Sequence, residues 1–238
     1  PGPLGAPNAL LAATGTAATA VLALRVTGCG VATLTAVTCS SGVAAVAALA
    51  GMVTTVPLHA IASVCVLGSV GLLEISPRMS IVLAGLSPTR LREDHLATKA
   101  MHADRLLTSL FAGFAWSAAV GAVVTDRVAF SIVTGTLLLL RARSLDKTRM
   151  LLFCSSGTVT IAMTFAVAAV AAPQHGPAIV ATTAVLAAVA IYLGSATSLS
   201  PVGRRGAELV ECVALVAMVP LTCWICGLLT AVRGLNPL

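Results

Sequence analysis

Charged side chains are scarce in this sequence, because only 9% of its 238 residues are Asp, Glu, Lys or Arg. A soluble globular protein has about 25% charged residues, most of them at its surface, so the scarcity excludes an ordinary soluble domain. Aromatic residues are also few, at 3%. Ala, Val, Leu, Gly and Thr must therefore do most of the packing, and small residues let membrane helices approach closely.

Signatures of soluble catalysis are missing as well. The sequence has no G-x-x-x-x-G-K-[ST], no H-E-x-x-H, no G-x-S-x-G and no dinucleotide fingerprint after a strand. This absence predicts a protein that is not an enzyme and that uses no cofactor or metal. The net charge of +6 does not indicate nucleic-acid binding, because the basic residues lie between apolar stretches, where they orient a membrane chain.

Long apolar stretches dominate what is present, and the mean hydropathy is +1.02. A membrane-spanning helix needs about 20 apolar residues. The sequence thus predicts an all-α polytopic bundle, a single domain over 1–238 with about eight spans. The fifth span has an uncharged core of only about 20 Å at 1.5 Å per residue, so it crosses only if Arg127 and Arg141 snorkel. The predicted spans are 4–24, 29–53, 56–75, 106–125, 127–143, 148–172, 177–197 and 209–232.

Basic residues alternate between the two sides of this topology. Twelve of the fourteen lie in one set of alternate loops, and only Arg127 and Arg233 lie on the other side. By the positive-inside rule the rich side is cytoplasmic, which places both ends of the chain outside. The chain begins at Pro1 without an initiator Met or a signal peptide, so we expect it to be a fragment of a longer protein.

The one long connection predicts a cytoplasmic amphipathic helix over 87–105. Ser87 is its candidate N-cap and Pro88 its first residue, and its polar face is either simply solvated or a docking surface for a cytoplasmic partner. His95 and His102 are seven residues apart and share a face. No third ligand follows at helical spacing, which argues against a metal site.

Ionisable residues within the spans are the usual sign of transport chemistry, and they are few. His59, Glu74, Glu208 and Glu211 all fall near span ends. Their positions favour interfacial or salt-bridged roles over ion carriage.

The seven cysteines mostly fall within apolar spans, where they pack as small hydrophobes. Cys223-Trp224-Ile225-Cys226 matches C-x-x-C, which allows redox or metal chemistry but favours packing inside a helix of this composition.

Gly113, Ser117 and Gly121 recur every four residues on the fourth span. This stripe predicts a helix-packing face, directed at another helix of the domain or at a second copy. Ala-rich helices also show such stripes by chance.

Three runs in order resemble a known family. Leu83-Ala-Gly-Leu-Ser-Pro88, Leu138-Leu-Leu-Arg-Ala-Arg-Ser144 and Pro220-Leu-Thr-Cys-Trp-Ile-Cys-Gly227 are similar to EccD, the multi-spanning inner-membrane component of mycobacterial type VII secretion. The resemblance covers residue 80 to the C-terminus, and the first three spans agree only in character.

The resemblance implies a non-enzymatic scaffold with eleven spans and a ubiquitin-like N-terminal domain, and this chain lacks that domain and about three spans. It also implies two EccD copies around a lipid-containing cavity, beside EccB, EccE and the ATPase EccC. We expect the cytoplasmic basic face to dock the partner, and the alternative function is a secondary transporter or channel for a small solute. The residues of that face are Arg90, Arg92, Lys99, Arg105, Arg141 and Arg143.

Overall fold

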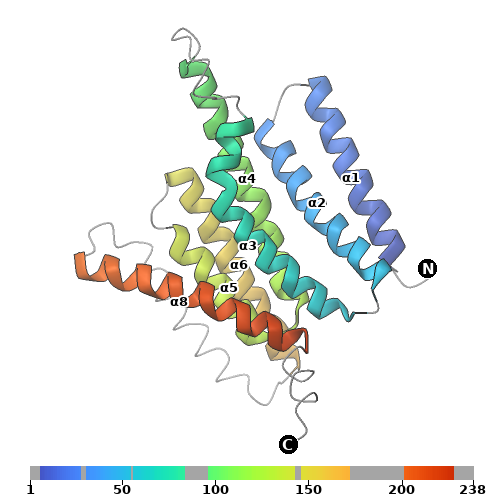
Figure 1. The fold of residues 1–238 in the computed structure, drawn as a ribbon, viewed down its shortest axis with the longest axis vertical. Helices are drawn as coiled ribbons and strands as arrows, with labels where there is room; N and C mark the ends of the chain where they lie inside the picture. Colours follow the sequence, from blue (N-terminus) through green and yellow to red (C-terminus); the bar gives the residue numbers. More distant parts are fainter. Residues whose placement is uncertain are drawn as a thin grey trace, which may run out of the picture. The chain divides into compact units, whose positions relative to one another are not determined.

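The chain is a helical protein in the computed structural model (Figure 1). The structure describes residues 6–27, 31–54, 56–83, 96–142, 146–171 and 201–227, and none of these belongs to a β-strand. The helices are α1 (Ala6–Thr27), α2 (Val31–Val53), α3 (Leu58–Leu83), α4 (Leu96–Val124), α5 (Val128–Arg141), α6 (Lys147–Ala171) and α8 (Pro201–Ile225).

Five of the described helices are long and apolar enough to cross a membrane, which confirms a polytopic helical membrane domain. The described residues do not support the predicted number of about eight spans. The apolar parts of α1 and α5 are shorter, and the predicted span over 177–197 lies outside the described residues. The five are Thr33–Val53, Leu58–Val82, Met101–Val124, Lys147–Val170 and Glu208–Ile225.

Two helices extend past the ends of the predicted spans, at charged residues. α3 continues past Glu74 to Leu83, and α8 begins at Pro201, before Arg205. Helical backbone bonds do not require apolar side chains, so a helix can run on into the interfacial region. At the other end, α8 stops at Ile225 instead of near 232, because Gly227 adopts φ 73° and ends the helix.

The predicted surface helix over 87–105 overlaps the start of α4. Residues 96–105 form the first turns of this helix, which runs to Val124 without a break at the predicted span boundary. The candidate cap, Ser87 and Pro88, lies outside the described residues.

The chain divides into two compact units, and α3 and α4 each contribute to both. The first unit contains α1, α2, the part of α3 from Gly68 and the part of α4 up to Ser117. In this unit α1 lies along α2 (Figure 1). Ala13 and Ala20 of α1 are buried and lie two turns apart, so α1 presents one narrow face of small side chains to its neighbour.

The second unit contains α5, α6, α8, the start of α3 and the end of α4. α5 packs against both α6 and α8. Its 14 residues rise only about 21 Å. Phe130, Leu137 and Leu138 on this helix are fully buried. α5 is therefore an interior helix, and its neighbours cover much of its surface.

The turn between α4 and α5 is tight. Asp126 adopts φ 54°, a left-handed conformation that Asp tolerates better than most residues. The Ser131 hydroxyl then donates to the carbonyl of Ala122 at 2.7 Å, which joins α5 to the last turns of α4. This turn lies between the predicted spans over 106–125 and 127–143.

Buried hydroxyls in both units mostly bond within their own helix. Thr160 donates to the Ser156 carbonyl at 2.7 Å, and Thr164 donates to the Thr160 carbonyl at 2.7 Å. Where no water is available, these bonds satisfy the hydroxyl group locally. The helices can then pack through these residues without leaving a polar group unsatisfied.

Candidate functional site

The predicted packing stripe on α4 begins at Gly113, which is buried against α2. A Cβ atom built on Gly113 would lie 2.7 Å from the Cys39 Cβ and 2.8 Å from the carbonyl oxygen of Ala36. The second neighbour is backbone and cannot turn aside. Only glycine therefore fits at this crossing of α4 and α2 without a shift of a helix.

The other two stripe positions face α3. The Ser117 hydroxyl donates to Ser69 Oγ at 3.0 Å and to the Phe114 carbonyl at 2.9 Å. A Cβ atom on Gly121 would lie 2.7 Å from Val66 Cγ2. The stripe thus lies against two neighbouring helices, and the effect of filling it with larger side chains stays a prediction.

Sequence reasoning missed a tighter contact, between α5 and α6. A Cβ atom on Gly157 would lie 2.9 Å from the Gly135 carbonyl oxygen and 2.8 Å from Leu139 Cγ, and one on Gly135 would lie 2.6 Å from Ile161 Cγ1. A four-residue step forward on α5, from Gly135 to Leu139, is matched by a step back on α6, from Ile161 to Gly157, so the two helices are antiparallel. The sequence shows a glycine among the small residues of each of these two spans. The spacing of residues along one helix, however, does not reveal which residue of another helix it contacts.

The six basic residues of the predicted docking face are only partly described. Arg105 is exposed on α4, and Arg141 is half-buried at the end of α5, with its Nη1 atom shielded from solvent. Lys99 belongs to the first turns of α4, and Arg90, Arg92 and Arg143 lie outside the described residues. The docking face therefore stays a prediction.

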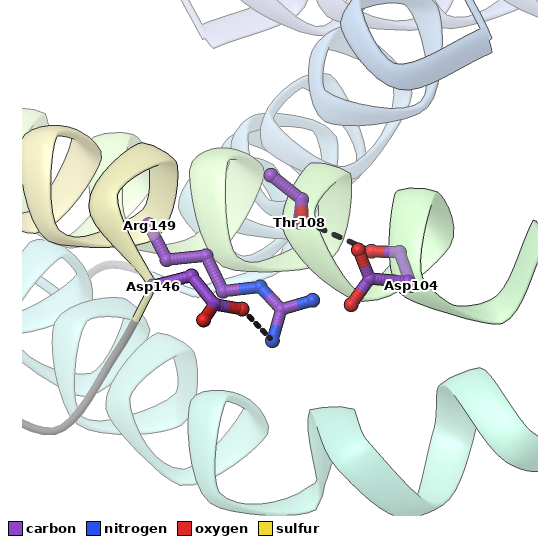
Figure 2. A network of polar contacts seen from close by, with 4 residues as sticks. All are labelled: Asp104, Thr108, Asp146 and Arg149. Atoms are coloured by element: carbon purple, nitrogen blue, oxygen red, sulfur yellow. Dashed lines mark hydrogen bonds and ion pairs between the residues drawn. The ribbon is translucent and has the colours of Figure 1, made fainter. Parts of the chain in front are cut away.

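A different arginine is placed more deeply. Arg149, in the first turn of α6, is only 9% exposed, and its Nη1 lies 3.9 Å from Asp146 Oδ2 (Figure 2). Asp146 itself is largely exposed. Arg149 is one of the twelve basic residues on the side predicted to be cytoplasmic, and its burial indicates a structural role. On α4, Thr108 donates to the carbonyl of Asp104 at 2.9 Å (Figure 2).

The C-x-x-C motif lies at the end of α8, where Cys223 and Cys226 are half-buried. Cys226 Sγ lies 4.0 Å from the Ala60 carbonyl oxygen and 4.0 Å from Ser63 Oγ, both on α3. The Cys226 N–H still makes a helical bond to the Thr222 carbonyl at 2.9 Å. Cys226 thus joins the last turn of α8 to the beginning of α3.

The remaining ionisable candidates do not converge on a site. Among the described residues no three His, Cys, Asp or Glu side chains are grouped to hold a metal ion. His59 and Glu211 are half-buried, Glu74 and Glu208 are exposed, and His102 is exposed on α4. His95 lies outside the described residues.

Comparison with known proteins gives this geometry a context. A family model described as the EccD-like transmembrane domain matches residues 1–235. The chain belongs to the EccD family. As an EccD family member it is 50% identical to the ESX-4 secretion system protein eccD4 of Mycobacterium tuberculosis, in strains CDC 1551 / Oshkosh and ATCC 25618 / H37Rv. The alignment covers 99% of this chain and 56% of each relative, so the chain spans about half of their length.

Two solved structures share the EccD fold of this chain. The structure of protomer 1 of the ESX-3 core complex matches with a TM-score of 0.75 and 17% identity, over 96% of this chain and 59% of that one. The MycP5-free ESX-5 inner membrane complex, State II, matches with a TM-score of 0.67 and 23% identity, over 82% and 51%. At these identities the likeness concerns the fold.

Proposed function

We propose that this chain is the membrane scaffold of a type VII protein secretion complex in the bacterial inner membrane. The observation that supports this most is the family match over residues 1–235, together with the 50% identity to an ESX-4 secretion protein. The packing of the described helices suits a scaffold. Their close contacts are made by glycines and by hydroxyl groups that donate hydrogen bonds to carbonyls of their own helix. Energy for export then comes from a partner that hydrolyses ATP.

The proposed topology has eight crossings, with both ends of the chain outside. Cys226 at the end of α8 lies against Ala60 in the first turn of α3, which supports an even number of crossings between these two residues. The helices α3, α4, α6 and α8 account for four. With α5 and the predicted span over 177–197 the proposed number is six, and the antiparallel packing of α5 on α6 supports a crossing by α5.

Labelling of single cysteines tests this topology in a background without native cysteines. A cysteine at Gln174 should react with a membrane-impermeant maleimide from outside, and one at Lys147 only after permeabilisation. The asymmetry of basic residues is the reason for the expected difference. The reverse pattern would contradict the proposed orientation.

The scaffold is proposed to act as an assembly. Two copies would pair around a lipid-containing cavity, beside EccB, EccE and the ATPase EccC. The exposed apolar surface of the described helices is compatible with lipid or protein neighbours, and residues such as Val53, Val82 and Val170 are 79%, 75% and 84% exposed. Large exposed apolar surfaces mark membrane or protein contacts.

Within this assembly the cytoplasmic basic face is proposed to dock the ATPase. The competing role of these residues is to set topology or attract anionic lipid, at about 1 kcal/mol for each basic residue near the surface. Exposed Arg105 and half-buried Arg141 are the two whose side chains the structure describes. The full set is Arg90, Arg92, Lys99, Arg105, Arg141 and Arg143.

Neutralisation of the six residues in groups of two or three tests the docking role. In the full-length protein, with membrane insertion verified, we expect weaker co-purification of the ATPase and reduced secretion together. Arg127, which lies on the opposite predicted side, provides a matched control. Secretion that survives replacement of all six would confine these residues to topology.

The alternative, a secondary transporter or channel, predicts a separate result. Purified protein in liposomes would then take up a small solute without a partner. A transporter usually has several ionisable groups at mid-membrane depth. Here His59 lies at the start of α3, and Glu208 and Glu211 lie at the start of the apolar segment Glu208–Ile225, so Glu74 alone of these four lies well within a candidate span. We therefore expect no uptake above that of empty liposomes.

A further inference from the structure

The two thiols at the end of α8 have no role in the scaffold function described above. Cys223 and Cys226 are one helical turn apart, and both are half-buried, so the described helices enclose neither sulfur completely. The Cys226 sulfur lies 4.0 Å from the Ala60 carbonyl oxygen and 4.0 Å from Ser63 Oγ, both on α3. Its thiol can donate to that carbonyl and so fasten α8 to α3.

We propose that Cys223 and Cys226 form a reversible redox pair that releases the end of α8 from α3 when it is oxidised. In the dithiol form, Cys226 bonds to α3. In the disulfide form it has no S–H to donate, and the contact with the Ala60 carbonyl is lost. The proposal goes beyond the scaffold function and concerns a chemical modification of this helix end.

The geometry of the last turn couples formation of the disulfide to release of α8 from α3. Residues three apart on a helix have Cβ atoms about 5–6 Å apart, whereas a disulfide needs about 3.5–4.5 Å. The bond therefore forms only if the last turn closes up. Cys226 makes the last helical N–H bond of the regular pattern, and Gly227 follows in a left-handed conformation that ends the helix. The required movement can thus stay within this turn.

The reaction is an ordinary thiol–disulfide exchange with a disulfide-bearing thiol oxidant. The Cys223 thiolate attacks one sulfur of the oxidant, which forms a mixed disulfide and releases the first thiol. The Cys226 thiolate then attacks the Cys223 sulfur and releases the second thiol. The protein loses two electrons and two protons and the oxidant gains them. A bond that requires helix distortion is strained, and strained disulfides are the easily reduced, regulatory ones.

The location of the pair suits this chemistry. It rests on the proposed orientation, in which the end of α8 faces the outside of the inner membrane. Disulfides persist in such oxidising compartments. Cys226 follows directly after the apolar segment Glu208–Ile225, which places the pair at the end of this candidate span.

Thiol trapping tests whether the pair forms. Membrane vesicles that contain the full-length protein are treated with oxidised glutathione, the remaining thiols are alkylated with a maleimide, and the peptides are analysed by mass spectrometry. We expect Cys223 and Cys226 to become unreactive together, as an internal disulfide that dithiothreitol reverses. Cys212, an exposed cysteine on the same helix, is the matched control and should not form a protein disulfide. Alkylation of both Cys223 and Cys226 after oxidation would overturn the proposal, as would separate glutathione adducts.

Hydrogen exchange of residues 222–227 tests the release. Oxidation should raise amide exchange there about two- to tenfold, the loss expected for one hydrogen bond. Cys226→Ser retains a donor and should keep slow exchange that oxidant does not change, as should Cys223→Ser. Cys226→Ala lacks the donor and should exchange faster without oxidant. Equal exchange in the oxidised and reduced wild-type protein would overturn the release even if the disulfide forms. Neither measurement depends on secretion, so failure of the scaffold function would leave this test valid.

Discussion

α2 and α5 are both apolar membrane helices, yet they are packed very differently. In the apolar window of α2 only 6% of residues are buried within the chain, whereas α5 buries residues along most of its 14-residue length. The shorter helix is thus the interior one. In water an apolar helix must be buried, but in a bilayer lipid satisfies an apolar surface equally well. Hydropathy therefore says that a helix enters the membrane and does not say what it touches there.

The space around each glycine distinguishes packed helix faces from open ones more clearly than the apolar side chains do. Gly135 and Gly157 lie at a backbone contact between α5 and α6, while a Cβ atom added to Gly15 or Gly42 would meet nothing within 4 Å. The same residue type is therefore a packing requirement in one helix pair and mere composition in another.

The largest effect is expected for Gly157→Leu on α6. Its Cβ would meet the Gly135 carbonyl at 2.9 Å, and backbone cannot turn aside. Overpacking of this kind costs about 1–3 kcal/mol and occasionally more. We expect a loss at the upper end of that range, measured as a lower thermal midpoint in detergent. Gly15→Leu on the open face of α1 is the control, and equal loss in both variants would remove the distinction between packed and open glycines.

A smaller loss is expected for Gly113→Leu on α4. Here the added side chain meets the Ala36 carbonyl and Cys39, but α2 is otherwise little buried and can move away. We expect destabilisation of about 1–2 kcal/mol and impaired assembly, again by thermal unfolding and by size-exclusion chromatography. Gly68→Leu on α3, where nothing lies within 4 Å, is the matched control. Unchanged stability and assembly would show that α2 is only loosely held.

The smallest effect is expected for Ser117→Ala on α4. The variant removes the hydrogen bond from Ser117 to Ser69 and leaves the helix shape intact. Hydrogen bonds between membrane helices average about 0.6 kcal/mol, so we expect a loss of that order. Thr108→Ala, which removes a hydroxyl bond to the Asp104 carbonyl of its own helix, is the comparison variant. A loss above about 2 kcal/mol for Ser117→Ala would mean that the stripe depends on this bond more than on close packing.

Membrane-helix boundaries were predictable only in part. Apolar length located five of the described spans, because insertion depends on the summed transfer free energy of neighbouring residues. A helix can extend past a predicted span end where it passes charges, as α3 passes Glu74 and Arg78 on its way to Leu83. Local backbone bonding, which apolar length does not report, sets these ends.

The sequence by itself determined that this chain is a polytopic helical membrane domain, and three of its runs were enough to suggest the EccD family. It also singled out Gly113, Ser117 and Gly121 as one face of α4, since a four-residue spacing defines a face on any helix. Only the tertiary structure decided which helices meet that face, that Gly135 lies against Gly157, and that Cys226 lies against α3. Periodicity describes one helix at a time, whereas a close contact depends on two helices whose matching positions are far apart in the chain.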